Sequence, residues 1–253
     1  MAGHNKWSKI KRKKGANDAA RAREHSKVAR AIMAASRSCG GDVSDLRLLS
    51  AIKAARAAQL PKDRINGAVE RGAKPGSGDA EMVQMRYDGS VPTPSGKVVV
   101  IAVALTDNRN RTAASVRASF NKVGGELLET GANDWMFENV GVALVPKRKS
   151  VEEGNENDQE DEFHEDDLLE AALEGNASDV DFGTEDDEHA FVKCDALDLL
   201  GLVAVLKEGM YEPSEFETRW MVKDETSMLE LDESSLEKFE KFLDRMDDDV
   251  DVT

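Results

Sequence analysis

The sequence has little cysteine and no long apolar run, and each shortage excludes a class of protein. Its two cysteines, Cys39 and Cys194, are far apart and suit neither a disulfide framework nor a zinc site. The longest apolar stretch, Val98–Leu105, suits a strand and falls well short of the ~20 residues of a membrane helix. The first residues lack the apolar segment of a signal peptide. We therefore expect free thiols in a reducing compartment and a soluble intracellular protein.

Positive charge is in the minority overall but is concentrated at one end. The chain has 34 Lys and Arg against 50 Asp and Glu, a net charge of −16, which taken alone argues against nucleic acid. Up to Lys74, however, 18 basic residues stand against 6 acidic ones, whereas the rest carries 16 basic against 44 acidic residues. This split predicts an N-terminal part that binds polyanions and a remainder that repels them.

Hydrophobic periodicity predicts an α+β fold, with an N-terminal helical bundle followed by two small α/β sandwich domains. After a flexible arm over 1–18, we expect helices over 17–38, 62–71, 112–123, 195–208 and 234–246, and a helix that starts over 168–173. A second helix, capped by Asp42 or Ser44, is expected to carry Leu46, Leu49, Ile52 and 55–57 at helical spacing and to end at Leu60-Pro61. Strands are expected over 81–87, 97–105, 135–137, 141–146, 180–182, 190–194 and 217–222. Residues 87–96 are expected to form a loop, and 97–105 to be buried on both faces or central in a sheet.

Composition also suggests where the domains divide. We expect a basic arm and helical bundle over 1–77, a discontinuous middle α/β domain over 78–137 and 212–253, and an inserted α/β domain over 138–211. The inserted domain carries an acidic loop over 152–165, which is too polar to fold alone. A solvated loop is the favoured interpretation, and the alternatives are a mimic of nucleic acid or an intramolecular shield for the basic arm.

The candidate nucleic-acid-binding residues gather near the N-terminus. Basic side chains at this density neutralise phosphates and release counterions, and Trp7 among them is suited to stacking on a base. The alternative is a solvated or targeting tail. The basic residues are Lys6, Lys9, Lys11, Arg12, Lys13, Lys14, Arg21, Arg23, Lys27 and Arg30.

A second candidate site is the segment TDNRNRT at 106–112, between the apolar strand and the next helix. Its aspartate and asparagines suit a tight turn or a helix cap. Arg109 and Arg111 would then lie at a strand end, where they could bind RNA phosphate. Helix capping with an internal salt bridge is an equally good interpretation of the same residues.

Signals of catalysis are weak. The four histidines, His4, His25, His164 and His189, lack HExxH spacing, and the sequence contains neither GxSxG nor a P-loop. We expect no enzymatic activity, no metal, no cofactor, no small-molecule substrate and no membrane partner. A metal-dependent nuclease is the enzyme alternative, because carboxylates abound.

Several segments in the same order resemble the YebC/PmpR family, which includes the mitochondrial translational activator of cytochrome c oxidase subunit I. The resemblance covers nearly the whole chain. The segments are MAGHNKWSKIKRKKGANDAAR at 1–21, LLSAIKAARAAQLPKDRINGAVERG at 48–72, TDNRNRT at 106–112, FNKVGGELLETGANDWMF at 120–137 and DLLEAALEGNASDV at 167–180.

The resemblance implies three domains, no catalysis, and either action on translation at the ribosome or DNA-binding transcriptional regulation. The expected partners are therefore ribosomal RNA or mRNA and the ribosome, or alternatively DNA. The chain departs from the family at 87–96, in place of a glycine-rich loop, and at 247–253, which lacks a clear final strand. These departures suggest a diverged member, located in the mitochondrial matrix in a eukaryote, although no presequence is visible, and in the cytoplasm otherwise.

Overall fold

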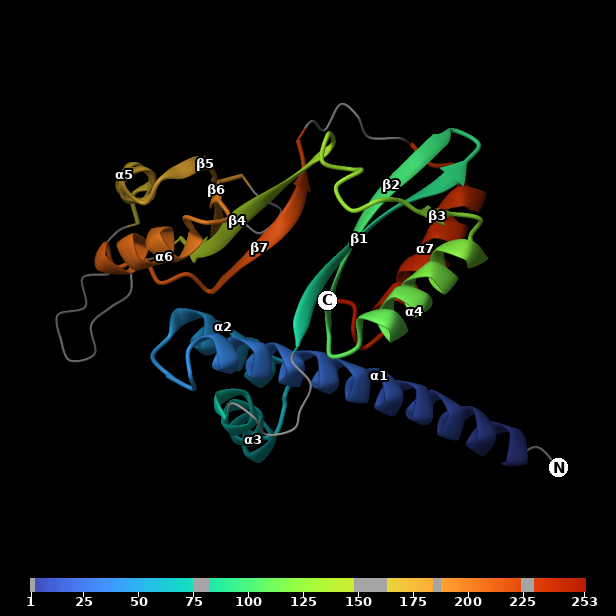
Figure 1. Cartoon of the computed structure of the whole chain (residues 1–253). Coiled ribbons are helices and arrows are strands. Elements are labelled where there is room, and N and C mark those ends of the chain that lie inside the picture. Colours follow the sequence, from blue (N-terminus) through green and yellow to red (C-terminus); the bar gives the residue numbers. More distant parts are fainter. Residues whose placement is uncertain (1–2, 75–81, 148–162, 184–187, 224–229) are drawn as a thin grey trace. The chain divides into compact units, whose positions relative to one another are not determined.

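The computed structural model describes residues 3–74, 82–147, 163–183, 188–223 and 230–253, with the backbone alone for 3–17. The chain divides into two compact units, one formed by 1–135 with 226–253 and the other by 136–225. Both contain helices and antiparallel sheets, so the expected α+β class is confirmed (Figure 1).

The first unit begins with three helices, α1 (Gly3–Ser38), α2 (Leu46–Ala57) and α3 (Lys62–Ala73). Their apolar faces meet in a core that includes Ile32, Leu48 and Ile65. Gly72 permits the close approach of α3 to α1, because an added Cβ would lie 2.5 Å from the carbonyl oxygen of Met33. The side chain that caps α2 is Asp45, which accepts from the amide of Arg47, and not Asp42 or Ser44 as expected.

The predicted flexible arm over 1–18 is wrong for its backbone, because α1 begins at Gly3. The segment contains no proline, and its lysines, arginines and alanines favour a helix that extends from the buried part of α1. The helix ends as expected at the glycine pair, where Gly40 and Gly41 have φ of 64° and 83°.

A three-stranded sheet follows, with β1 (Val83–Thr93) between β2 (Gly96–Thr106) and β3 (Glu126–Leu127). The loop predicted over 87–96 is therefore wrong, since β1 runs through most of it and pairs with β2 as far as Thr93. Gly89 is required there by packing, because an added Cβ would lie 2.4 Å from the ring of Phe120. Pro92 lies beyond the end of β3, which pairs only with Gly89 and Ser90, at an edge where proline is tolerated.

The expectation that 97–105 is central or buried on both faces is also wrong. β2 is the outer strand of its sheet, and burial alternates at Ala102, Ala104 and Thr106. The C-terminal segment covers its free edge with a single antiparallel bridge from Val252 to Ala104. The amide of Leu105 donates to the carbonyl of Asp251 at 2.7 Å. This short pairing lies within 247–253, where the sequence predicts no clear final strand.

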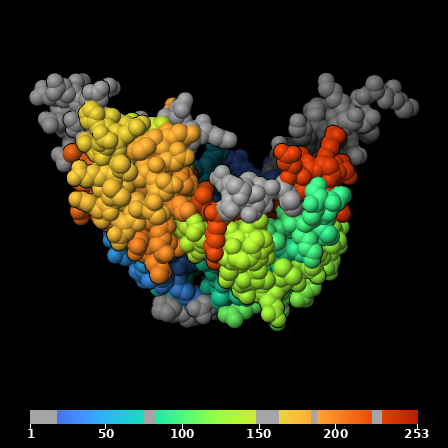
Figure 2. All heavy atoms as spheres, turned by 90° about the horizontal axis from the view of Figure 1, so that it is seen from above, coloured from blue at the N-terminus to red at the C-terminus, as the bar shows by residue number. Residues whose placement is uncertain are grey.

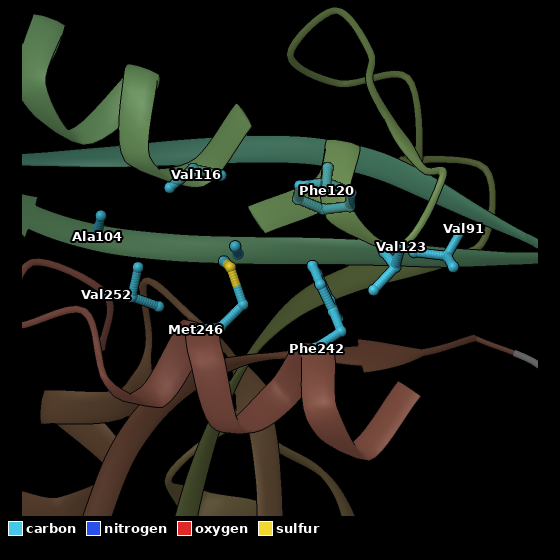
Figure 3. Packing of buried hydrophobic residues seen from close by; sticks show 9 residues of the cluster. Val91, Ala104, Val116, Phe120, Val123, Phe242, Met246 and Val252 are labelled. Carbon is cyan, nitrogen blue, oxygen red and sulfur yellow. The ribbon is translucent and has the colours of Figure 1, made fainter. Parts of the chain in front are cut away.

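Helices α4 (Arg109–Lys122) and α7 (Glu233–Asp247) lie side by side against this sheet (Figure 1). The rings of Phe120 and Phe242 meet edge to face with centroids 4.9 Å apart, a contact worth about 0.5–1.5 kcal/mol beyond burial. Figure 3 shows them among Val116, Met246 and Val252 in one core. In the space-filling view, the red C-terminal residues lie against green residues of the segment that forms β1, β2 and α4 (Figure 2).

The second unit is a four-stranded sheet in the order β5 (Ala177–Asp181), β6 (His189–Asp195), β4 (Phe137–Pro146), β7 (Glu215–Val222). Helices α5 (Glu165–Glu174) and α6 (Leu199–Glu208) contribute its apolar side chains, among them Leu168, Leu202 and Leu206. The strands predicted over 135–137 and 141–146 are one strand, β4. Because β7 pairs along β4, residues 215–222 belong to this unit and not to the middle domain predicted over 212–253.

Candidate nucleic-acid interface

Helix α1 places the candidate residues of the N-terminus along one continuous helix. The side chains of the first seven lie outside the described part of the chain, so their contacts stay a prediction. These residues are Lys6, Trp7, Lys9, Lys11, Arg12, Lys13 and Lys14.

The other four candidates of α1 divide between two faces of the helix. Arg21 is exposed and donates to the side-chain oxygen of Gln59, at the end of α2. Arg23, Lys27 and Arg30 follow at spacings of four and three residues, which places them on one face. That face meets the C-terminal segment of the chain.

Two arginines of this face form ion pairs with aspartates of the C-terminal segment. The Arg23 guanidinium lies 2.5 Å from a carboxylate oxygen of Asp248. Arg30 pairs with Asp251 and also donates to the carbonyl of Val250 at 3.2 Å. The face that was predicted to meet phosphate is therefore already in contact with carboxylates of the same chain.

The segment TDNRNRT forms the start of α4, and both interpretations of it can be compared with the structure. Asn108 caps the helix, its side chain accepting from the amide of Arg111 at 3.1 Å. Arg111 donates to Asp251 at 2.8 Å and to Asp107 at 2.6 Å. Arg109 begins the helix and is exposed. Capping and an internal salt bridge thus account for Arg111, while Arg109 is accessible to a ligand.

Asp251 is the centre of this arrangement. The residue is 2% exposed, and its carboxylate accepts hydrogen bonds from Arg30, from Arg111, and from the hydroxyl of Thr112 at 2.7 Å. Burial alone would raise the pKa of Asp251, but these charge-assisted hydrogen bonds outweigh it and the pKa is lowered. The hydrogen bonds that Arg111 donates to Asp251 and then to Asp107 raise the pKa of Arg111. The site thus holds an anion between two arginines and a hydroxyl, donors that suit a carboxylate or a phosphate.

Further basic side chains are exposed on the helical domain, beyond those singled out from the sequence. For those in α2 and α3, the surface position could have been inferred from the apolar period, because they fall outside the buried helix faces. They are Arg37, Lys53, Arg56, Lys62, Arg64, Arg71 and Lys74.

The remaining candidate chemistry is sparse. Within the described ranges, no three His, Cys, Asp or Glu side chains gather as metal ligands would. Burial, followed by the negative charges of Asp198 and Asp195, raises the pKa of the Cys194 thiol to about 11.

Of the acidic loop predicted over 152–165, residues 152–162 lie outside the described part of the chain. Among the helices described, none combines the length and apolar character of a membrane span.

Comparison with known proteins places these features in a family context. Residues 5–75 match a model described as the TACO1/YebC protein N-terminal domain, and residues 82–253 match the TACO1/YebC second and third domain. A "Probable transcriptional regulatory protein" of Trichormus variabilis is 38% identical over 256 residues, covering 100% of this chain and 94% of that protein. One of the same description from Thermosynechococcus vestitus is 36% identical over 253 residues, with 100% and 92% covered.

Among solved structures, a conserved hypothetical protein from Aquifex aeolicus superposes with a TM-score of 0.69 at 29% identity. The match covers 92% of this chain and 87% of that one. The sequence therefore matches one family along most of its length, and the chain shares its fold with this solved structure.

Proposed function

The chain belongs to the TACO1/YebC family, and on that premise we propose that it is a nucleic-acid-binding regulator of gene expression that activates translation through ribosomal RNA or mRNA. The observation that carries the proposal is the segregation of charge. Within residues 1–74, 18 basic residues stand against 6 acidic ones, and many of the basic side chains are exposed. Such a surface attracts a phosphate backbone of any sequence.

The proposal assigns separate tasks to the parts of the chain. The N-terminal helix and bundle contact phosphates, with Arg109 at the start of α4 as a further exposed contact. The acidic remainder repels nucleic acid and thereby limits contact to the basic surface. In this proposal the protein performs no catalysis. Metal-stimulated RNA cleavage that is abolished by one carboxylate substitution would overturn that part of it.

A DNA-binding transcriptional regulator is the second candidate, and two observations favour it. The relatives described above carry the name of probable transcriptional regulatory proteins. In addition, α2 and α3 are joined by only four residues, Ala58 to Pro61, a connection of the length found in helix-turn-helix motifs. This candidate requires affinity for defined promoter sequences well above the non-specific background.

Sedimentation of a cell lysate through a density gradient at low and high salt separates the two candidates. The native chain is compared with a Lys11/Arg12/Lys13/Lys14→Ala variant. We expect the native chain to travel with ribosomes at low salt and to leave them at high salt, and the variant to stay at the top. Native protein that stays at the top even at low salt would contradict the ribosomal proposal, and binding to DNA fragments would then be measured. The compartment, mitochondrial matrix or cytoplasm, stays a prediction.

A further inference from the structure

Three basic residues of α1, Arg23, Lys27 and Arg30, form what we call the basic stripe. Their spacing of four and three residues places them on one helix face, and this face contacts the acidic C-terminal segment through Arg23 and Arg30. All three are partly accessible. This stripe is where the proposed nucleic-acid surface and the chain's own carboxylates come together.

The two ion pairs of the stripe differ in how firmly they are held. Asp251 is buried, and it is fixed by two arginines, a threonine hydroxyl and the backbone pairing with β2. By contrast, the pair between Arg23 and Asp248 has side chains that are 34% and 62% exposed. An exposed ion pair contributes little to stability, so an incoming anion can replace its carboxylate at small cost.

The surroundings of Asp248 provide both room and charge for a larger anion. Asp248 borders a cleft of about 490 Å³ between α4 and the C-terminal segment. Lys122 and Arg245 also line this cleft, together with Ser115 and Ser119. Lys122 and Arg245 bring two cations to the cleft that Asp248 borders, where Asp249 and Asp251 also contribute carboxylates. The Ser115 hydroxyl already donates to Asp249. Among these carboxylates, Asp248 is the one that pairs with Arg23, so it is the one that a phosphate must displace to reach this arginine.

We infer that Asp248 is a built-in competitor for nucleic-acid phosphate on Arg23, and that the phosphodiester backbone of a bound RNA displaces Asp248 while Asp251 stays in place. The inference rests on the proposed function and adds regulation to its binding surface. Asp247 and Asp249 flank Asp248 and increase the negative potential that a polyanion meets there. Only a ligand with several phosphates, held elsewhere on α1, overcomes this potential, so the competitor discriminates against isolated anions.

A double-mutant cycle on the full chain tests the inference. The affinity for a fluorescently labelled single-stranded RNA is measured by anisotropy at low salt, with the DNA of the same sequence as a second probe. The variants are Asp248→Asn, Arg23→Gln and the double variant. Asp247→Asn is the matched control, because it removes the same charge from an exposed neighbouring residue for which the described residues offer no ion-pair partner. Circular dichroism checks that each variant is folded.

We expect Asp248→Asn to tighten RNA binding by about 1.5- to 5-fold relative to Asp247→Asn, the range set by an exposed ion pair. In the Arg23→Gln background this difference in affinity disappears, because the guanidinium for which Asp248 and the RNA phosphate compete is absent. DNA is expected to give the same pattern, since the recognised group is the phosphodiester.

Two outcomes overturn the inference while leaving the proposed function intact. In the first, native chain binds RNA but Asp248→Asn and Asp247→Asn have the same affinity. In the second, the gain from Asp248→Asn persists in the Arg23→Gln background. A native chain that binds neither RNA nor DNA at low salt overturns the proposed function, and the inference with it.

Discussion

Arg30 of α1 and Asp251 of the C-terminal segment form an ion pair although 221 residues separate them along the chain. The same carboxylate accepts from Arg111 at the start of α4. One aspartate thus joins the first helix, the TDNRNRT segment and the last residues of the chain. Because a buried carboxylate is stable only when it is paired, these three segments depend on one another for stability.

Replacing Asp251 by asparagine is expected to destabilise the protein by about 1–3 kcal/mol, because two guanidinium groups and a buried hydroxyl lose their charged acceptor. Urea unfolding at neutral pH measures the change. Asp107→Asn is the control, since Asp107 also accepts from Arg111 but its side chain is 39% exposed, and we expect it to change stability little. Equal effects of the two substitutions would contradict the central position of Asp251.

The lowered pKa of Asp251 predicts the pH dependence of this contribution. In the unfolded chain, Asp251 binds a proton near its ordinary pKa of about 3.9, whereas in the folded chain it stays ionised to lower pH. Its contribution is therefore complete above that pH and is lost as the pH falls through the folded-state pKa. The stability difference between native chain and Asp251→Asn should shrink in acid. A difference that is constant from neutral pH to acid would contradict this.

Gly89→Ala is expected to destabilise the chain by about 1–3 kcal/mol, because the new Cβ would overlap the buried ring of Phe120 and the carbonyl of Glu126. Gly67→Ala in α3 is the control with the opposite sign. Apart from its chain neighbours and the nearby backbone of its own helix, nothing lies within 4 Å of its added Cβ, so alanine should stabilise that helix by about 0.5–1 kcal/mol. Thermal unfolding compares the two, and a shift in the same direction for both would contradict the packing described for β1 and α4.

The two cysteines are expected to differ in reactivity. Cys194 is 1% exposed and its pKa is raised to about 11, so almost none of it is thiolate at neutral pH. Cys39, at the end of α1, is partly exposed. Brief treatment of the folded protein with iodoacetamide, followed by mass spectrometry, should modify Cys39 and leave Cys194 intact. Rapid modification of Cys194 would show that its burial in the second unit is incomplete.

The local elements could largely be predicted from the sequence, because a buried helix face shows in the 3.6-residue period of its own residues. Phe239 and Phe242 indicate α7 in this way, as do Leu199, Leu202 and Leu206 for α6, whereas Leu236, expected on the same side of α7, is exposed. Failures arose where a distant partner decides the local structure. Glycines and prolines over 87–96 favour a loop, yet pairing with β2 extends the strand to Thr93.

The candidate interface could likewise be predicted from the sequence only in part. Charge density marked α1 as basic, and the sequence left phosphate binding and an internal salt bridge as equal alternatives for Arg111. No local pattern could show that Asp251, 140 residues away, accepts hydrogen bonds from Arg111. Nor could a local pattern show that Asp248 forms an ion pair with Arg23. Contacts at such separation depend on the tertiary fold, and the short C-terminal segment gives no strand signal of its own.

The central claim is that the basic N-terminal helix holds nucleic acid through its phosphates. The most direct test is the salt dependence of affinity for single-stranded RNA, measured for the native chain and the Lys11/Arg12/Lys13/Lys14→Ala variant. The matched control is Lys97/Arg219/Lys238/Lys241→Ala, which removes four exposed cations outside the helical domain. We expect the N-terminal variant to bind more weakly and the slope of log affinity against log salt to fall by as much as about 3, while the control keeps the native slope. Equal slopes for all three proteins would contradict the claim.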